Sequence, residues 1–295
     1  MRITQRAVAL TSLQGLNRNL ETVGKLQQQL TSGRQINTPA DSPTGTNKAM
    51  QTRSEQAAVT QQARTISDAR GWLEQTDSTL QTMLATTRRV RDLTVQGLNG
   101  GALNQQARQA LATEVASLRE SLLAMANTKM QGRPVFGGIT AGAQAYDETT
   151  GAWTGLAGGG VMRQVSDTEA LRIDVTGIEA FGAAPADLFT VVQNIVTDLT
   201  AAPAALDGHL ADLDTAMKGM HTAIADIGAR GARLERVAAV NADRSLTLSS
   251  QLAETENVDL PNTIMRLQMQ QVGYEAALAA TAKALQPTLL DFLAR

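Results

Sequence analysis

The chain has 295 residues, of which 43% are hydrophobic and only 3% aromatic, and its formal net charge at pH 7 is −2. This length is enough for one or two folded domains, and apolar content made of Ala, Leu, Val, Ile and Met favours helix-on-helix packing. The near-neutral charge provides no field for nucleic acid, and the lack of cysteine excludes a disulfide scaffold, a thiol nucleophile and a Cys-ligated zinc site.

An amphipathic helix is predicted from about Gln5 to Ser32. Its apolar residues recur at alternating spacings of three and four, which places them on one face of a helix. The members of this stripe that we expect to pack against other helices are Leu13, Leu16, Leu20, Val23 and Leu30. Gly33 follows and tolerates the left-handed conformation that ends many helices.

The segment after this helix contains two prolines, Pro39 and Pro43. Pro39 disfavours helix for the residue before it, whereas Ser42 can cap a second helix and Pro43 can occupy its first position. That helix is predicted to be long and to end near the glycine pair at 100–101. A third helix is predicted around 111–125, where apolar residues again recur at spacings of four and three.

Helical periodicity is lost between 135 and 175. Frequent glycines and the alternating run at 171–175 favour short strands joined by turns. Tyr146 and Trp153 flank the segment 147–151 as two strands flank a hairpin turn, and both aromatics suit strands. We therefore predict a small β-rich insert instead of a full sheet domain.

Helix returns at about Pro185 and stops near 201–203. The most regular stripe of the chain follows, from Leu210 to Ala238, and indicates a long helix packed at a shallow angle against others. Gly231 lies in that stripe, where we expect it to allow a close approach of a neighbouring helix.

The last helix is predicted to begin after Asp259, which can cap it, and to run to about Leu285. Its apolar repeat includes Ile264, Leu267, Tyr274, Leu278 and Leu285. The tail around Phe292 is strongly apolar for a chain end, which favours burial in an assembly. An apolar seam needs a cover, and the simplest cover for one terminal helix is the other. For either end alone, an ordinary amphipathic helix docked on its own bundle is an equally good interpretation.

Nothing in the sequence favours catalysis. The two histidines, His209 and His221, have no matching set of carboxylates and histidines nearby, and the glycine-rich run at 155–160 lacks dinucleotide-binding spacing. No apolar run approaches the roughly 18 residues of a membrane span, and the start of the chain lacks a run of signal-peptide length. We therefore expect no enzyme activity, no cofactor, no metal and no membrane insertion, and any export would not depend on a cleaved signal.

Two adjacent motifs resemble a known family. The segment 30–37 (LTSGRQIN) is similar to the N-terminal signature of the flagellin superfamily, and 39–45 (PADSPTG) is similar to the Pro-Ser-Asp-Asp-Pro pattern of its hook-associated protein 3 branch. Ser42 departs from that pattern, where the second Asp is expected. The residues that carry the match are Ser32, Gly33, Ile36, Asn37, Pro39, Asp41, Pro43 and Gly45. Further similarity lies at 90–93, 131–138, 228–235 and 276–281, and it is weakest at 141–182.

The resemblance implies an elongated, mainly α, flagellin-like helical bundle with paired terminal coiled-coil helices. Residues 1–40 with 258–295 would form the terminal coiled-coil core domain, 41–131 with 184–257 the helical bundle domain, and 132–183 the small β-rich outer insert. The implied function is that of a structural subunit at the junction between the flagellar hook and the filament. The implied location is extracellular, after export through the flagellar type III apparatus.

The implied partners are further copies of the chain in a ring, the first hook-associated junction protein on the hook side, flagellin, an export chaperone and the export apparatus. Two alternatives stay open: a flagellin that polymerises into the filament itself, and a cytoplasmic helical adaptor. The first would self-assemble into long filaments, and the second would leave the paired terminal motifs unexplained.

Overall fold

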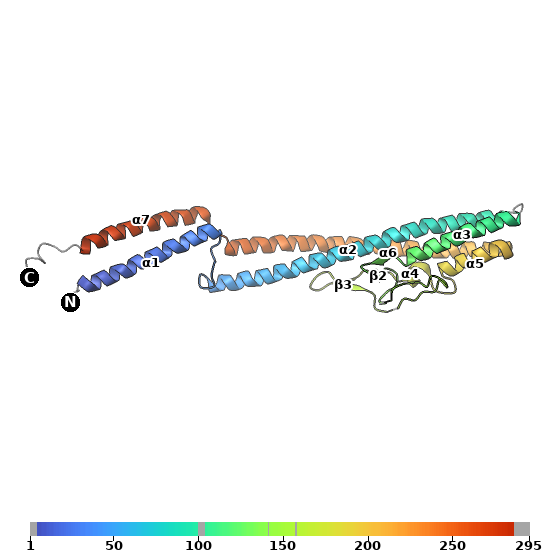
Figure 1. Ribbon diagram of the computed structural model, residues 1–295, viewed down its shortest axis with the longest axis horizontal. Helices are drawn as coiled ribbons and strands as arrows, with labels where there is room; N and C mark the ends of the chain where they lie inside the picture. Colours follow the sequence, from blue (N-terminus) through green and yellow to red (C-terminus); the bar gives the residue numbers. More distant parts are fainter. Residues whose placement is uncertain (1–4, 100–103, 141, 157, 286–295) are drawn as a thin grey trace, which may run out of the picture. The chain divides into compact units, whose positions relative to one another are not determined.

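The computed structural model describes residues 5–99, 104–140, 142–156 and 158–285. The chain divides into two compact units, Met1–Ala58 with Arg244–Arg295, and Val59–Asp243. Two long helices contribute to both units, α2 (Pro43–Leu98) and α6 (Leu206–Glu256). The prediction of a mainly helical fold with a small β-rich insert is confirmed (Figure 1).

In the first unit, α1 (Gln5–Ser32) packs antiparallel to α7 (Leu260–Leu285) (Figure 1). Gly33 ends α1 with a φ of 69°, a left-handed conformation that glycine adopts without steric cost. At the start of α7, Oδ1 of Asp259 accepts a hydrogen bond from the backbone N–H of Asn262 at 3.2 Å. The predicted end of the first helix and the predicted cap of the last are both confirmed.

In the second unit, parts of α2 and α6 pack around one apolar core with the shorter helices of the chain. These are α3 (Gln105–Ala126), α4 (Gly177–Phe181), α5 (Leu188–Ala201) and the 3-10 turn η1 (Pro203–Ala205). The side chain of Asn104 caps α3, and that of Asp187 caps α5 by accepting from the backbone N–H of Thr190 at 3.4 Å. Asp187 therefore starts α5, close to the start that the sequence predicts at about Pro185.

The β-rich insert contains two antiparallel strand pairs, β1 (Lys129–Met130) with β2 (Arg133–Pro134) and β3 (Met162–Gln164) with β4 (Ala170–Arg172). Tyr146 and Trp153 form a single antiparallel bridge, so the predicted hairpin is reduced to one pair of residues. Oδ1 of Asp147 accepts from the backbone N–H groups of Thr149 and Thr150, which fixes the turn between them. Helix α4, within the insert, was not predicted.

Four aromatic rings join the insert to α5. Phe136, Tyr146, Phe181 and Phe189 are all almost fully buried, and their ring centroids lie 4.6 to 6.0 Å apart in tilted or edge-to-face pairs. Such pairs add about 0.5–1.5 kcal/mol each beyond the burial of their area. The few aromatics of the chain are thus concentrated where the insert meets the helices.

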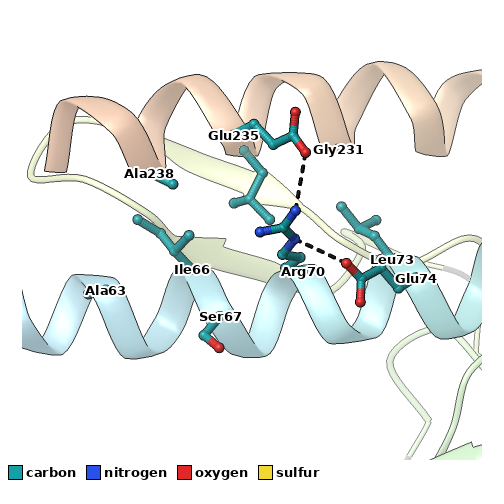
Figure 2. Close-up of a pocket in the computed structure, with 10 residues that line it drawn as sticks. Ala63, Ile66, Ser67, Arg70, Leu73, Glu74, Gly231, Glu235 and Ala238 are labelled. Carbon is teal, nitrogen blue, oxygen red and sulfur yellow. Dashed lines mark hydrogen bonds and ion pairs between the residues drawn. The ribbon is translucent and has the colours of Figure 1, made fainter. Parts of the chain in front are cut away.

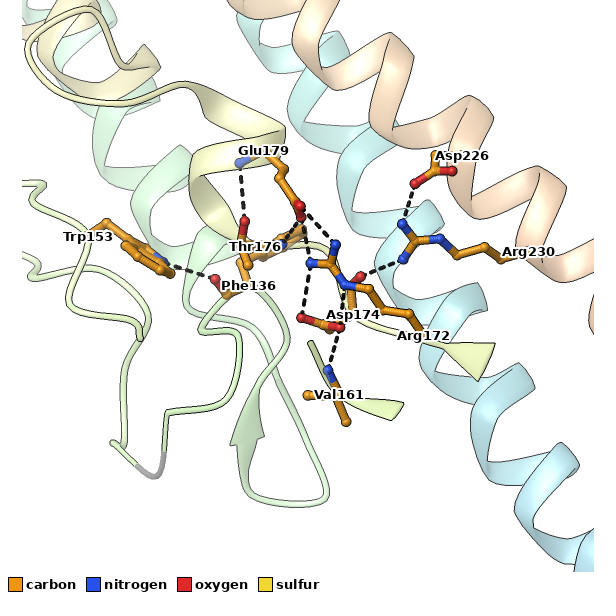
Figure 3. A network of polar contacts seen from close by, with 9 residues as sticks. All are labelled: Phe136, Trp153, Val161, Arg172, Asp174, Thr176, Glu179, Asp226 and Arg230. Atoms are coloured by element: carbon orange, nitrogen blue, oxygen red, sulfur yellow. Dashed lines mark hydrogen bonds and ion pairs between the residues drawn. The ribbon is translucent and has the colours of Figure 1, made fainter. Parts of the chain in front are cut away.

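A network of charged groups holds the insert to α6 (Figure 3). Asp174 is fully buried, and its Oδ1 accepts from the backbone N–H of Val161 at 2.6 Å and from Nε of Arg172 at 3.0 Å. Arg172 also forms a two-pronged pair with the carboxylate of Glu179. Arg230 on α6 donates to the backbone carbonyl of Asp174 at 2.7 Å and pairs with Asp226. The buried carboxylate therefore organises both the strand pair and its contact with α6.

The expected close approach at Gly231 is wrong. A Cβ atom added at Gly231 would meet no atom within 4 Å, because this glycine lines a cavity of about 270 Å³ between α2 and α6 (Figure 2). Arg70 lies over the cavity and pairs with Glu74 on its own helix and with Glu235 on α6. The small side chain therefore opens space between these helices here instead of closing it.

Candidate assembly surface

The contact between α1 and α7 is a narrow seam. Of the residues predicted to pack, Leu16, Val23 and Leu30 on α1 and Leu267 and Tyr274 on α7 are half-buried. Within the seam, Nε2 of Gln270 donates to Oδ1 of Asn19 at 3.0 Å. A polar pair inside an apolar seam fixes the register of the two helices. Asn19 was missed by the sequence reasoning, since a polar residue breaks an apolar stripe.

The structure does not bring the other predicted packing residues into this seam. Leu13 and Leu20 are each 53% exposed, and Ile264 and Leu278 are 46% and 43% exposed. Their helical positions place them beside the seam, as a second stripe on the same pair of helices. The backbone of Leu285 belongs to α7 while its side chain is outside the described part, and Phe292 lies outside the described residues.

Further apolar side chains of the pair also face away from the seam. Those that are about half exposed or more are Leu10, Leu260, Met265, Met269 and Val272. Met265, Met269 and Val272 follow at spacings of four and three and so share one face of α7, on the side away from Leu267 and Tyr274. A helix that is apolar on several faces is typical of buried positions. The α1–α7 pair thus presents an uncovered apolar surface, which we call the terminal apolar surface.

The motif after α1 is an ordered, hydrogen-bonded turn centred on Asp41. Its Oδ2 accepts from the backbone N–H groups of Asn37 at 3.1 Å and Thr38 at 2.9 Å, and its Oδ1 pairs with Nζ of Lys25 at 2.8 Å. The hydrogen bond from Lys25, and then those from the two backbone groups, hold the pKa of the Asp41 carboxyl well below its ordinary value. Lys25 lies on α1, more than one helical turn before the motif begins at Leu30. The sequence did not predict that it pairs with Asp41.

The remaining motif residues lie in the same turn or at the start of α2. The hydroxyl of Ser32 accepts from the backbone N–H of Arg34 at 3.2 Å, and the hydroxyl of Ser42 accepts from that of Gly45 at 3.1 Å. Pro43 is the first residue of α2, as predicted, and Pro39 is exposed. A Cβ added at Gly45 would lie 2.6 Å from Cδ1 of Ile36, so a larger residue at 45 would displace this half-buried isoleucine.

The turn is paired with the segment that joins α6 to α7. Arg34 and Asn257 form an antiparallel bridge, the backbone N–H of Gln35 donates to the carbonyl of Glu256, and that of Val258 donates to the carbonyl of Gly33. The carboxylate of Glu256, a residue only 7% exposed, pairs with Arg53 at 2.8 Å. Its partner is 203 residues away in sequence, and no local pattern could have predicted the pair.

The described residues contain no group of three or more His, Asp or Glu side chains arranged to hold a metal ion. His209 is held by Asp198, with 2.7 Å between Nε2 and Oδ2, so it lies at a helix boundary with a structural partner. None of the helices in the described part combines the length and apolar content of a membrane span.

The sequence is similar to those of known flagellar proteins. Residues 3–141 match the model of the bacterial flagellin N-terminal helical region. The chain is 25% identical to flagellar hook-associated protein 3 of Escherichia coli K12, over 95% of this chain and 96% of that protein. It is also 25% identical to flagellar hook-associated protein 3 of Salmonella typhimurium LT2, over 94% and 95% of the two chains.

Solved structures share the fold. A flagellar hook-associated protein of Vibrio parahaemolyticus superposes with a TM-score of 0.67 at 20% identity, covering 74% of this chain and all of that one. Bacillus cereus FlgL superposes with a TM-score of 0.60 at 23% identity, covering 69% of this chain and 99% of that one. The predicted resemblance is confirmed: residues 3–141 match the flagellin N-terminal helical region, and the chain is similar over nearly its whole length to flagellar hook-associated protein 3.

Proposed function

We propose that this chain is a structural, non-enzymatic subunit at the hook–filament junction of the bacterial flagellum. There it would connect the first hook-associated protein on the hook side to the flagellin filament. The observation that carries the proposal is the terminal apolar surface, read together with the names of the relatives that align with nearly the whole chain. The proposal includes extracellular placement after export by the flagellar type III apparatus, with a chaperone and without a cleaved signal.

The physical argument rests on what the terminal helices leave exposed. Full burial of one large aliphatic side chain is worth about 1.5–3 kcal/mol, so a half-exposed Leu can still gain about 1 kcal/mol from a neighbouring subunit. This burial energy is still available to four side chains, Leu13, Leu20, Ile264 and Leu278. More is available to Met269 and Val272, because they are 70% and 66% exposed. Packing of several copies in a ring would cover these side chains, which is why we assign the predicted packing residues to subunit contacts.

The three regions take different roles in this proposal. Residues 1–40 with 258–295 form the terminal core domain that packs into the inner tube, and 41–131 with 184–257 form the helical bundle domain around it. Residues 132–183 would form the small β-rich outer insert. The ordered turn around Asp41, tied to Glu256 and Val258, supports the first of these boundaries because it lies where the two terminal helices meet α2 and α6.

A substitution at Leu278 tests the assembly surface. Leu278→Asp places a charge on the terminal apolar surface, and the 43% exposure of this side chain lets the free protein accommodate it. In a strain that lacks the chromosomal gene, we expect the variant to be exported into the medium at normal levels and to fail to retain filaments on hooks. Motility on soft agar and secreted protein are measured together, so that a failure of export is distinguished from a failure of assembly.

Two control variants accompany this experiment. Leu278→Met keeps the apolar contact and should restore motility, and Gln268→Asp adds the same charge at an exposed polar position of α7 and should be much less damaging. If Leu278→Asp retained filaments as well as Leu278→Met, the terminal apolar surface would not be the subunit contact. Self-assembly of the purified chain into long filaments would favour a flagellin, and failure of export with one stable cytoplasmic partner would favour an adaptor.

A further inference from the structure

The cavity of about 270 Å³ between α2 and α6 lies within the second unit and is lined mainly by apolar side chains (Figure 2). Ile66, Leu73 and Leu234 line it and are each less than 10% exposed. Gly231 keeps the space free, because a Cβ added there would meet no atom within 4 Å. An apolar cavity of roughly 150 Å³ already holds a group of the size of benzene. The cavity therefore has room for an apolar side chain of another molecule.

The charged residues that line this cavity carry one more negative than positive charge. The guanidinium of Arg70 pairs with Glu74 at 3.0 Å and with Glu235 at 3.3 Å, so two carboxylates share one cation (Figure 2). The side chains of the two glutamates are 67% and 66% exposed and are therefore accessible to a further cation. The rim thus favours a partner that carries a basic group beside its apolar side chain.

The opposite side of α6 carries the complementary set of groups. Val240 follows Gly231 by nine residues, which is about two and a half helical turns, so the two positions lie on opposite sides of the helix. Val240 is 68% exposed. Beside it, Arg233 pairs with Glu169 of the insert at 2.6 Å, whereas the exposed Arg236 forms no ion pair with a described residue. This side therefore combines an exposed aliphatic side chain with an excess of one positive charge.

We propose that the cavity receives Val240 of a second copy of this chain, a contact that rests on the ring of subunits in the proposed function. The two copies would use opposite sides of α6, and such heterologous contacts generate rings when the rotation closes. Arg236 of the neighbouring copy would then lie beside Glu235 of the first. A two-fold contact is disfavoured, because it would bring together either two acidic rims or two basic sides.

Disulfide trapping in isolated flagella tests this contact, since the chain has no cysteine of its own. Ala63→Cys alters an exposed residue that lines the cavity, and Val240→Cys alters the inserted side chain. The two full-length variants are expressed at equal levels in a strain that lacks the chromosomal gene. After oxidation, we expect disulfide-linked dimers from the mixture and none from either variant alone. Thr113→Cys, at an exposed position of α3, replaces Ala63→Cys in a control mixture and should give no dimer.

Filling the cavity should block the contact. Gly231→Leu, placed in the Ala63→Cys copy, occupies the space from within the chain and should lower the yield of the mixed dimer several-fold. Gly208→Leu makes the same change at an exposed glycine of α6 that does not line the cavity, and should leave the yield unchanged. The thermal unfolding midpoints of the purified variants check that both fold.

Charge reversal tests the pairing of the two sides. Arg236→Glu, placed in the Val240→Cys copy, brings a carboxylate to the acidic rim and should lower the yield at least about tenfold. Glu235→Arg, added to the Ala63→Cys copy, should restore the yield because the charges across the contact are then exchanged. Restoration by a change in the other copy is not expected if Arg236→Glu merely destabilises its own chain.

The outcomes separate this contact from the function on which it rests. The contact would be overturned, and the junction proposal left intact, if flagella contained the protein but no mixed dimer. Equal yields from the mixture and from the single variants, or an unchanged yield with Gly231→Leu, would overturn it as well. Absence of the protein from isolated flagella would overturn both proposals.

Discussion

In the second unit, Phe136, Tyr146, Phe181 and Phe189 are buried against one another, whereas in the α1–α7 pair Leu13 and Leu20 stay more than half exposed. Both regions are rich in apolar residues, so composition does not separate them. The difference lies in how many faces are covered. The insert, α3, α5 and α6 surround a common core, while in the described part of the chain α1 and α7 pack chiefly on each other along one seam. The first region is stabilised within the chain, whereas the proposed function assigns the uncovered faces of the second to contacts with other subunits.

The largest expected contrast is in stability. Phe181→Ala removes a fully buried ring from the aromatic cluster and should lower the free energy of unfolding by about 3–5 kcal/mol. Leu20→Ala, at a side chain that is 53% exposed, should lower it by less than about 1 kcal/mol in the free protein. Urea denaturation followed by circular dichroism measures both. Equal losses would mean that the α1–α7 pair is as fully packed as the core.

The second contrast is in local opening. Amides of α1 and α7 should exchange with deuterium at least about 100-fold faster than those of α3 and α5, because one half-buried seam provides less protection than a closed core. Exchange is followed by mass spectrometry on the free protein at low concentration. Brief protease treatment should likewise remove the terminal helices first. Equal protection of the two regions would contradict dependence on neighbouring subunits.

The third prediction concerns the network that holds the insert to α6. Asp174→Asn keeps the shape of a fully buried side chain but weakens its bonds to Val161 and Arg172, and should cost about 2 kcal/mol of stability. Asp226→Asn serves as the matched control, since this partner of Arg230 is exposed and its loss should cost less than about 1 kcal/mol. Thermal unfolding compares the two variants. Similar shifts of the unfolding temperature would mean that the hydrogen bonds of the buried Asp174 stabilise the protein no more than the exposed ion pair of Asp226 does.

The smallest effect is expected in the turn around Asp41 and depends on pH. Because the folded pKa of this carboxyl is below its ordinary value of 3.8, its stabilisation is fully present above that value and is lost as the pH falls toward the folded pKa. The amides of Asn37 and Thr38 should therefore stay protected at pH 5 and lose protection below about pH 4. Asp41→Asn should show weaker protection with no such acid transition. An unchanged pH profile in that variant would assign the transition to another group.

Much of the fold followed from local chemistry. Gly33, Ser42 with Pro43, and Asp259 each specify a helix end through their own backbone or side chain, and these ends occur where the sequence predicted them. The stripes were harder to interpret. A spacing of three and four marks a broad apolar face but does not say which edge of it is covered, so Leu16 and Val23 were predicted together with the exposed Leu13 and Leu20.

Other features depend on residues far apart in the sequence. The Glu256–Arg53 pair and the bond between Gln270 and Asn19 join segments about 200 residues apart or more, and neither has a local signal. The role expected for Gly231 was wrong because the lack of a side chain permits either close packing or open space, and only the neighbouring helix decides between them.

The most direct test of the proposed function is the position of the protein on the cell. Immunogold electron microscopy would compare flagella from the parent strain with those of a deletion strain and its complemented derivative. The account predicts a short labelled band between hook and filament in the parent and the complemented strain, and loss of filaments in the deletion. Label along the whole filament, or no extracellular label, would contradict it.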